Sequence, residues 1–276
     1  MLGGFVAFRL HFTKSLWGLS RLCLAVGLLA ALWTCLGGCA LDGGAKNVVK
    51  DCILPTDQAG TLIGKWKTMA VPIAFQAGAF SSSEMSEMVS AADTWNTFYA
   101  ASLGLAAIDY GDKGSPRTSS VAKPTSLCST GILSGSTYSG QVVIYKKNPW
   151  PSTYAANAIA LTTACPSAGK PFSFFFTAIM ELNYQNFFVQ GKKLPDLQSI
   201  VLHEFGHLVG LKHSCESTAS TGMPNCSTAG LDPLYLSASM YPSFSFNSQW
   251  EGEQRRDLNE NDQGRANCLY ETTTAN

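Results

Sequence analysis

The stretch His203-Glu204-Phe205-Gly206-His207, with His213 six residues further on, determines how the rest of this sequence can be interpreted. Residues four apart lie on the same face of a helix, so the first two imidazoles can reach one metal ion. Glu204 directly follows the first of these ligands and can act as a general base beside the metal. The stretch therefore predicts a catalytic zinc site rather than a set of buried core histidines.

The residues around this stretch predict a helix over 197–209. Asp196 can cap its start, Ile200, Val201, Phe205 and Leu208 are among its apolar positions, and Gly210 can end it. A glycine can adopt a positive φ, which lets the chain turn back after the helix. This turn would bring His213 to the metal as a third ligand.

The complete pattern, H-E-x-x-H-x-x-G-x-x-H followed by a Met-turn, resembles the metzincin zinc peptidases. Chance would produce the first part of it at roughly two in a million in a chain of this composition. Among metzincins the sequence is most similar to the matrixins, the matrix-metalloproteinase-like peptidases, through Ser239-Met240-Tyr241-Pro242 and Leu258-Asn259-Glu260-Asn261-Asp262. The resemblance implies an α+β, zincin-like catalytic domain with a twisted mixed sheet, a long N-terminal helix, a zinc-binding helix and a C-terminal helix.

The same resemblance implies roles for several residues after the zinc helix. Met240 would form the floor under the zinc, and Asp262 would brace the Met-turn. The substrate pocket would include Tyr241, Pro242 and Phe244. The chain departs from the family at Phe244, where tyrosine is common, and at Asn261, where aspartate is common.

A further metal is constrained by composition. The sequence has four histidines, and the fourth, His11, lies near the N-terminus, so a second histidine-ligated zinc is not expected. Calcium is possible, although Asp109, Asp112 and Asp232 show no dedicated loop pattern.

We therefore expect a zinc-dependent endopeptidase that hydrolyses proteins or peptides through a zinc-activated water, with Glu204 as general base. One alternative is a surface-anchored binding protein with a purely structural zinc, although structural sites usually have four protein ligands. Another is a peptidase of a different metzincin branch. The astacin and serralysin types have a tyrosine two residues after the Met-turn methionine, where this chain has Pro242.

The N-terminus has the features of an export signal. Arg9, Lys14 and Arg21 precede an apolar run that ends in Leu36-Gly37-Gly38-Cys39. The end of this run resembles a bacterial lipobox, which implies a signal peptide over 1–38 and a membrane-anchoring lipid on Cys39. The predicted location is then the bacterial cell envelope, as an outer-membrane lipoprotein. Ordinary signal cleavage and secretion is the alternative.

Six cysteines remain after this leader, and an even number in an exported chain favours disulfides. Sequence alone leaves fifteen pairings open. Our preferred pairs are Cys52 with Cys268, Cys128 with Cys165, and Cys215 with Cys226. Cys52 followed by Ile53-Leu54-Pro55 faintly resembles the latency thiol of matrixins, and this role would leave an odd number of cysteines.

Composition supports one catalytic domain over 65–276, behind a polar tether over 39–64. Removing three basic residues with the leader leaves 16 basic and 19 acidic side chains. This mild acidity, with no basic cluster, excludes a nucleic-acid binder, and we expect a monomer.

Besides the helix over 197–209, the sequence predicts helices over 82–101 and 259–270, strands over 69–75, 105–110, 141–146, 156–165 and 172–183, and a long loop over 111–140.

Overall fold

The computed structural model describes residues 48–125, 127–128, 141–167 and 172–270. The predicted signal segment and the lipobox with Cys39 lie outside these residues. Within the described ranges, no helix is long and apolar enough to cross a membrane.

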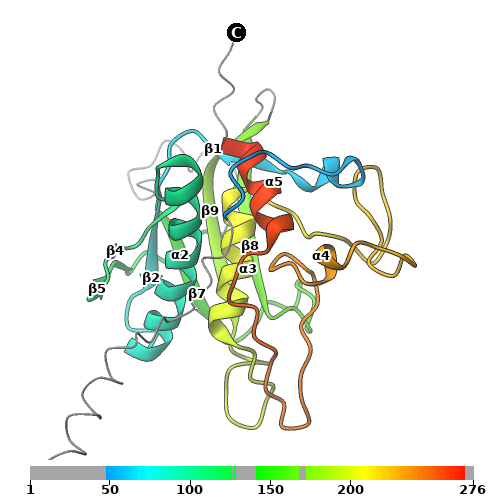
Figure 1. Ribbon diagram of the computed structural model, residues 1–276. Coiled ribbons are helices and arrows are strands. Elements are labelled where there is room, and N and C mark those ends of the chain that lie inside the picture. The colour runs from blue at the N-terminus through cyan, green and yellow to red at the C-terminus, as the bar shows by residue number, and fades with distance from the viewer. Residues whose placement is uncertain (1–47, 126, 129–140, 168–171, 271–276) are drawn as a thin grey trace, which may run out of the picture. The chain divides into compact units, whose positions relative to one another are not determined.

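The fold is a mixture of α and β structure around a mostly parallel sheet (Figure 1). Its path runs β1 (Gly64–Trp66), β9 (Ser173–Asn183), β7 (Val142–Lys147), β2 (Val71–Gln76) and β3 (Ile108–Asp109), all paired in parallel. β6 (Thr118–Ser119) also pairs in parallel with β2, and β8 (Ala160–Ser167) pairs with β9 in the antiparallel direction. The sheet is thus mixed, as the sequence predicts, with β8 as its antiparallel member.

The long helix α2 (Ser82–Leu103) connects β2 to β3, which is the kind of crossover that parallel strands need. Ser81 and Glu84 form a capping box at its start, and Gly104 ends it with φ 70°. Apolar side chains at helical spacing form a stripe along this helix, and most of them are buried, including Met88, Val89 and Trp95. The capping and the stripe explain why the sequence located this helix to within a few residues.

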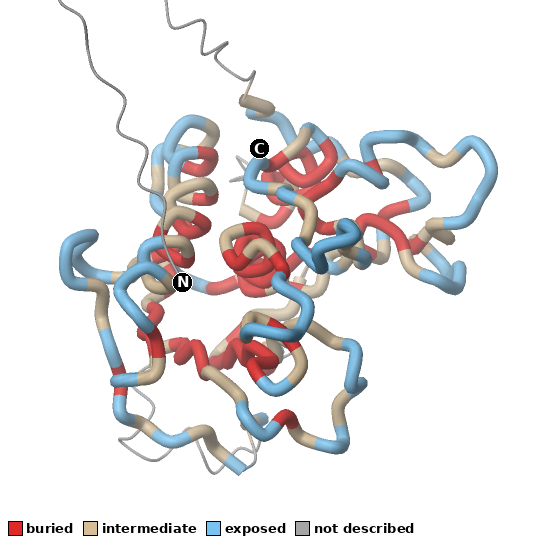
Figure 2. Tube along the Cα trace, turned by 90° about the horizontal axis from the view of Figure 1, so that it is seen from below, coloured by how far each residue is buried: buried red, intermediate tan, exposed pale blue. Residues whose placement is uncertain are grey.

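The core lies between the sheet and three helices, α2, α3 (Leu197–Val209) and α5 (Glu260–Tyr270). Figure 2 shows the buried residues gathered at the centre, with exposed loops around them. Two buried indoles tie α3 to its neighbours, because Trp95 Nε1 donates to Leu202 O at 2.9 Å and Trp66 Nε1 donates to Leu208 O at 2.7 Å. These hydrogen bonds satisfy polar groups that burial would otherwise leave without partners. They fix the helix that carries the predicted metal ligands.

The segment before β1 is part of the folded domain, so the predicted tether is too long. Residues 48–64, assigned from sequence to the tether, pack into the domain and include a 3₁₀ helix, η1 (Thr56–Thr61), and part of β1. Gln58 is fully buried and donates to Ser214 O at 2.7 Å, while Val49 N donates to Gln263 on α5 at 2.9 Å. These contacts are long-range, so the local polar composition gave no sign of them.

The predicted loop over 111–140 also contains short strands. β4 (Gly111–Asp112) and β5 (Ser115–Pro116) form a small antiparallel pair, and β6 follows them. Strands of two residues are too short for a periodic pattern, which explains why the sequence predicted only loop. After α3, the remaining element is the four-residue helix α4 (Pro233–Leu236).

Three disulfides cross-link the domain. They join Cys52 to Cys268, Cys128 to Cys165, and Cys215 to Cys226, which are the pairs preferred from sequence. The first ties the segment before η1 to α5. Because Cys52 is bonded to Cys268, its alternative role as a latency thiol does not apply to this structure.

Candidate metal centre

Local sequence explains how α3 delivers two histidines and then stops. Asp196 caps the helix by accepting from Ser199 N at 2.9 Å. Gly210 ends the helix with φ 119°, a conformation that suits glycine. A Cβ at Gly210 would also lie 1.9 Å from Gly64 O, so the turn needs glycine for space as well.

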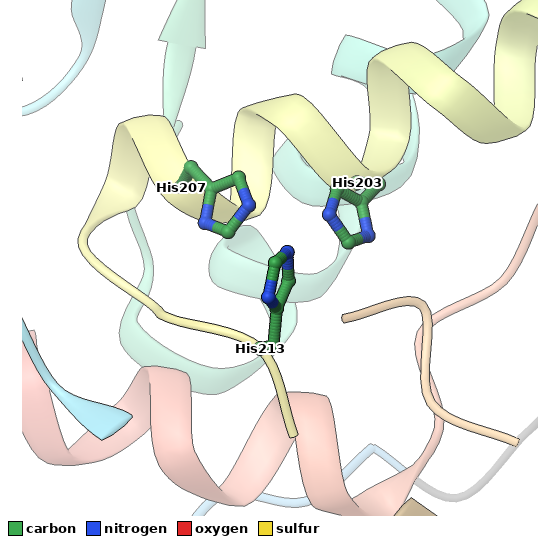
Figure 3. A group of neighbouring side chains, drawn as sticks. All are labelled: His203, His207 and His213. Carbon is green, nitrogen blue, oxygen red and sulfur yellow. The ribbon is translucent and has the colours of Figure 1, made fainter. Parts of the chain in front are cut away.

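The three histidines converge, as Figure 3 shows: His203 and His207 extend from α3, and His213 comes from the segment after the turn. The ring centroids are 4.8 to 5.1 Å apart. One ring nitrogen from each histidine lies within 4.8 Å of the other two. The structure thus brings together the three residues that the sequence predicted as ligands, in a group that could hold a metal ion.

Hydrogen bonds at Nδ1 determine which ring nitrogen carries a proton in all three histidines. His203 Nδ1 bonds Ser239 O at 2.7 Å, His207 Nδ1 bonds Leu211 O at 2.8 Å, and His213 Nδ1 bonds Glu216 Oε1 at 2.7 Å. A carbonyl or carboxylate oxygen can only accept, so each Nδ1 carries the proton and donates it. In a neutral ring, Nε2 then keeps a free lone pair, which is what a metal requires.

Burial favours the neutral form of two of these rings. It lowers the pKa of His203 well below its usual value, and the neighbouring His207 and His213 lower that pKa further. Burial likewise lowers the pKa of His207 to about 3. Both rings are therefore neutral near pH 7 and do not need to lose a proton before binding a cation.

Glu204 faces the same cavity as the three histidines. Its side chain is buried, and within the described part of the chain its Oε2 has no hydrogen-bond partner. Burial raises the pKa of this carboxyl to about 7, although hydrogen bonds from Thr162 act in the opposite direction. A carboxyl with such a pKa can take up and release a proton near neutral pH.

The turn around Met240 lies directly against α3. Asp262 on α5 accepts from Ser239 N at 2.7 Å and from Met240 N at 3.1 Å, so the predicted bracing acidic residue contacts the turn. A Cβ at Gly206 would lie 2.1 Å from Met240 Sδ. Gly206, for which the sequence predicted no role, is therefore needed for the close approach of this methionine to α3.

The predicted pocket residues divide into two groups. Pro242 and Phe244 line a cavity of about 790 Å³ together with the histidines, and the Phe244 ring meets His203 edge-on at 5.9 Å. Tyr241 is not among the lining residues, and its ring instead faces the guanidinium of Arg255 at 4.9 Å. The guanidinium of Arg255 also faces the Phe244 ring, at 5.1 Å, so the role of Tyr241 as a pocket residue stays a prediction.

Sequence reasoning missed several residues of this site. One wall of the cavity is the segment 157–164, which includes the start of β8, and Glu216 lies beside His213. Arg265, fully buried on α5, donates to Lys212 O at 3.1 Å and to His213 O at 3.3 Å. The segment 157–164 and Arg265 join the site from distant parts of the chain, whereas Glu216 is only three residues from His213 and belongs to no motif.

Two of the three acidic residues considered for calcium, Asp109 and Asp232, have other contacts. Asp109 Oδ2 pairs with Arg117 at 2.9 Å, and Asp232 Oδ1 accepts from Leu234 N at the start of α4. Within the described residues, the histidine group is the one cluster of three or more histidine, cysteine or acidic side chains that could hold a metal. Calcium binding therefore stays a prediction.

Comparisons with known proteins add little to this geometry. No protein-family model matches the chain, and no curated protein matches it. A solved structure of high choriolytic enzyme 1 (HCE-1), a hatching enzyme zinc-protease from Oryzias latipes (Medaka fish), is similar at 14% identity, with 75% of this chain and 94% of that chain covered and a TM-score of 0.34. At that TM-score we base no argument on the similarity.

Proposed function

We propose that this protein is a zinc-dependent endopeptidase of the metzincin type, similar to the matrixins. One observation carries the proposal: three imidazoles with Nδ1 protonated converge beside a buried carboxylate oxygen that has no partner within the described residues. Ligands and a base in one cavity are the parts that metal-assisted hydrolysis needs.

The residues fit zinc better than calcium or magnesium. Imidazole nitrogens suit zinc, whereas calcium and magnesium prefer oxygen ligands. Three protein ligands also leave one position of a tetrahedral site for water or substrate. When bound there, zinc would act as a Lewis acid toward the scissile carbonyl and toward water.

The remaining roles belong to the chain. Glu204 would accept the proton of the attacking water at Oε2 and return it to the leaving amine. Met240 would hold the hydrophobic floor against Gly206, and Asp262 would fix the turn that carries Met240. Pro242 and Phe244 would line the substrate pocket.

A peptide is the substrate that the cavity wall suits. Among the described strands, β8 pairs with β9 alone, so its other edge is open to a peptide. Residues 157–164, which include the start of β8, line the cavity. An extended peptide can add to a sheet edge by main-chain hydrogen bonds, which would hold it across the site. Main-chain recognition of this kind supports cleavage within a protein chain.

The test is hydrolysis by the purified domain with its zinc content measured in the same sample. We expect one zinc per chain, cleavage of casein and of a peptide library, and inhibition by a hydroxamate chelator. A protein that binds zinc and cleaves nothing would contradict the proposal. If zinc removal also unfolded it, the result would favour the alternative, a surface-anchored binding protein with a structural zinc.

Export and anchoring belong to the same proposal. The three disulfides support an exported protein, because such bonds persist in oxidising compartments. We further propose lipid attachment at Cys39 in a bacterial envelope. Radiolabelled palmitate should then appear in the wild-type protein and be absent from Cys39→Ser, and equal labelling of both would contradict the assignment.

A further inference from the structure

The third histidine of the site is held differently from the other two. His203 and His207 donate to the main-chain carbonyls of Ser239 and Leu211, which are fixed by the backbone. His213 instead donates to a side chain, that of Glu216, at 2.7 Å. The orientation of this one ring therefore depends on whether Glu216 stays in place.

Glu216 is about one-third exposed, and its own position depends on a small cross-linked loop. The adjacent Cys215 is bonded to Cys226. Two main-chain hydrogen bonds close the same loop, from Glu216 N to Pro224 O at 2.9 Å and from Cys226 N to Glu216 O at 2.8 Å. Nine residues lie between these two hydrogen-bonded ends, and most of them are exposed.

The chain on the other side of Cys215 is anchored in the core. Ser214 N donates to Met240 O at 2.8 Å, and Ser214 Oγ donates to Tyr235 O at 2.6 Å. Cys215 is fully buried, so the disulfide attaches the exposed loop to a fixed point one residue before Glu216. Without this bond, only hydrogen bonds would hold the loop: the two at Glu216, Asn225 Nδ2 to Ser217 O at 3.0 Å, and Gly60 N to Gly222 O at 2.8 Å, which attaches the loop to η1.

We propose that Glu216 is a positioning residue for His213, and that the Cys215–Cys226 disulfide holds it there, so that zinc affinity depends on this disulfide. A carboxylate that accepts from a ligand histidine fixes the orientation of the ring and raises its basicity toward the metal. The inference rests on the proposed zinc site and adds a dependence of that site on oxidation.

The first experiment measures zinc dissociation constants by chelator competition, together with melting of the metal-free proteins. Glu216→Ala should weaken zinc binding by about 10–100-fold. Glu216→Gln should lose less, because its amide oxygen can still accept from His213. The melting temperatures of metal-free Glu216→Ala and Glu216→Gln should equal that of the metal-free wild type. If Glu216 only stabilised the fold, these temperatures would fall. Glu251→Ala, an exposed control, should bind zinc as the wild type does.

The second experiment removes the disulfide. Cys215→Ser/Cys226→Ser should weaken zinc binding. Adding Glu216→Ala to this variant should raise its zinc dissociation constant less than threefold further, because Glu216 would already be out of place. Cys128→Ser/Cys165→Ser removes a different disulfide and should leave zinc binding unchanged. If the first pair fails to fold, Cys215→Ala/Cys226→Ala replaces it, because it avoids a buried hydroxyl at residue 215.

The outcomes separate the two proposals. A wild-type protein that does not bind zinc would overturn the proposed function itself. Tight wild-type binding with Glu216→Ala within twofold would overturn the positioning role. Glu216→Ala could also weaken zinc binding as much in the variant without the Cys215–Cys226 bond as it does in the wild type. That result would overturn the proposal that the disulfide holds Glu216 in place.

Discussion

Replacing Glu204 with glutamine is expected to stabilise the metal-free protein at alkaline pH. The glutamine side chain has nearly the same size and cannot ionise. Glu204 is buried, and its Oε2 has no partner within the described residues, so the negative charge is costly to hold there. The site would thus keep a carboxylate that weakens the fold because catalysis needs it.

The magnitude follows from the pKa of Glu204, which burial raises from 4.5 to about 7. Between these two values the folded protein binds more protons at this carboxyl than the unfolded chain does. Stability from this group is therefore fully present below pH 4.5 and is lost as the pH rises through about 7. The complete shift corresponds to about 3 kcal/mol.

The assay is urea unfolding of metal-free, disulfide-intact protein at pH 4 and pH 8. The difference in unfolding free energy between Glu204→Gln and wild type should be about 3 kcal/mol larger at pH 8 than at pH 4. Other titrating groups are common to both proteins and cancel in this difference. Glu251→Gln, on an exposed loop, is the control and should show no such change. A pH-independent difference for Glu204→Gln would show that the Glu204 carboxyl does not titrate with a raised pKa in the folded protein.

Three further predictions concern the surroundings of the site. Gly206→Ala places a Cβ 2.1 Å from Met240 Sδ and should destabilise the protein by about 1–3 kcal/mol in urea unfolding, whereas Gly114→Ala, with open space around it, should not. Equal stability of the two variants would contradict the close packing. Asp262→Asn leaves the buried Arg265, 3.6 Å away, without an opposing charge, so we expect a loss of about 3–5 kcal/mol, and a loss below about 1 kcal/mol would be inconsistent with the ion pair. Cys52→Ser/Cys268→Ser removes a cross-link between residues 216 apart and should lower stability by about 2–5 kcal/mol, with an unchanged melting temperature as the contrary result.

The parts of the fold that the sequence predicted are those with a local cause. α2 and α3 have caps, periodic apolar residues and glycine stops within their own sequence. The histidine spacing likewise follows from the geometry of one helix and one turn. Such features need no knowledge of distant residues, so the convergence of the three histidines could be predicted.

The parts that the sequence missed depend on distant partners. β1 is three residues long and pairs with Ser173–Phe175, more than a hundred residues away. Arg265 reaches His213 from α5, 52 residues along the chain, which leaves no local pattern. Glu216 is an exception, because it lies three residues after His213 and was missed for lack of a motif. Gly206 stood within the quoted motif, yet its role required the position of Met240. Contacts between residues that are distant in sequence could therefore not be predicted from local patterns.

Glu204 is proposed to act as the base at a zinc site formed by three histidines. The test of this role is kcat/KM for a quenched peptide, measured for wild type and Glu204→Gln with the zinc content of each sample determined. We expect one zinc per chain in both proteins and a fall in kcat/KM of about 10²–10⁴-fold in the variant. Undiminished cleavage by the zinc-loaded variant would show that Glu204 is not the base.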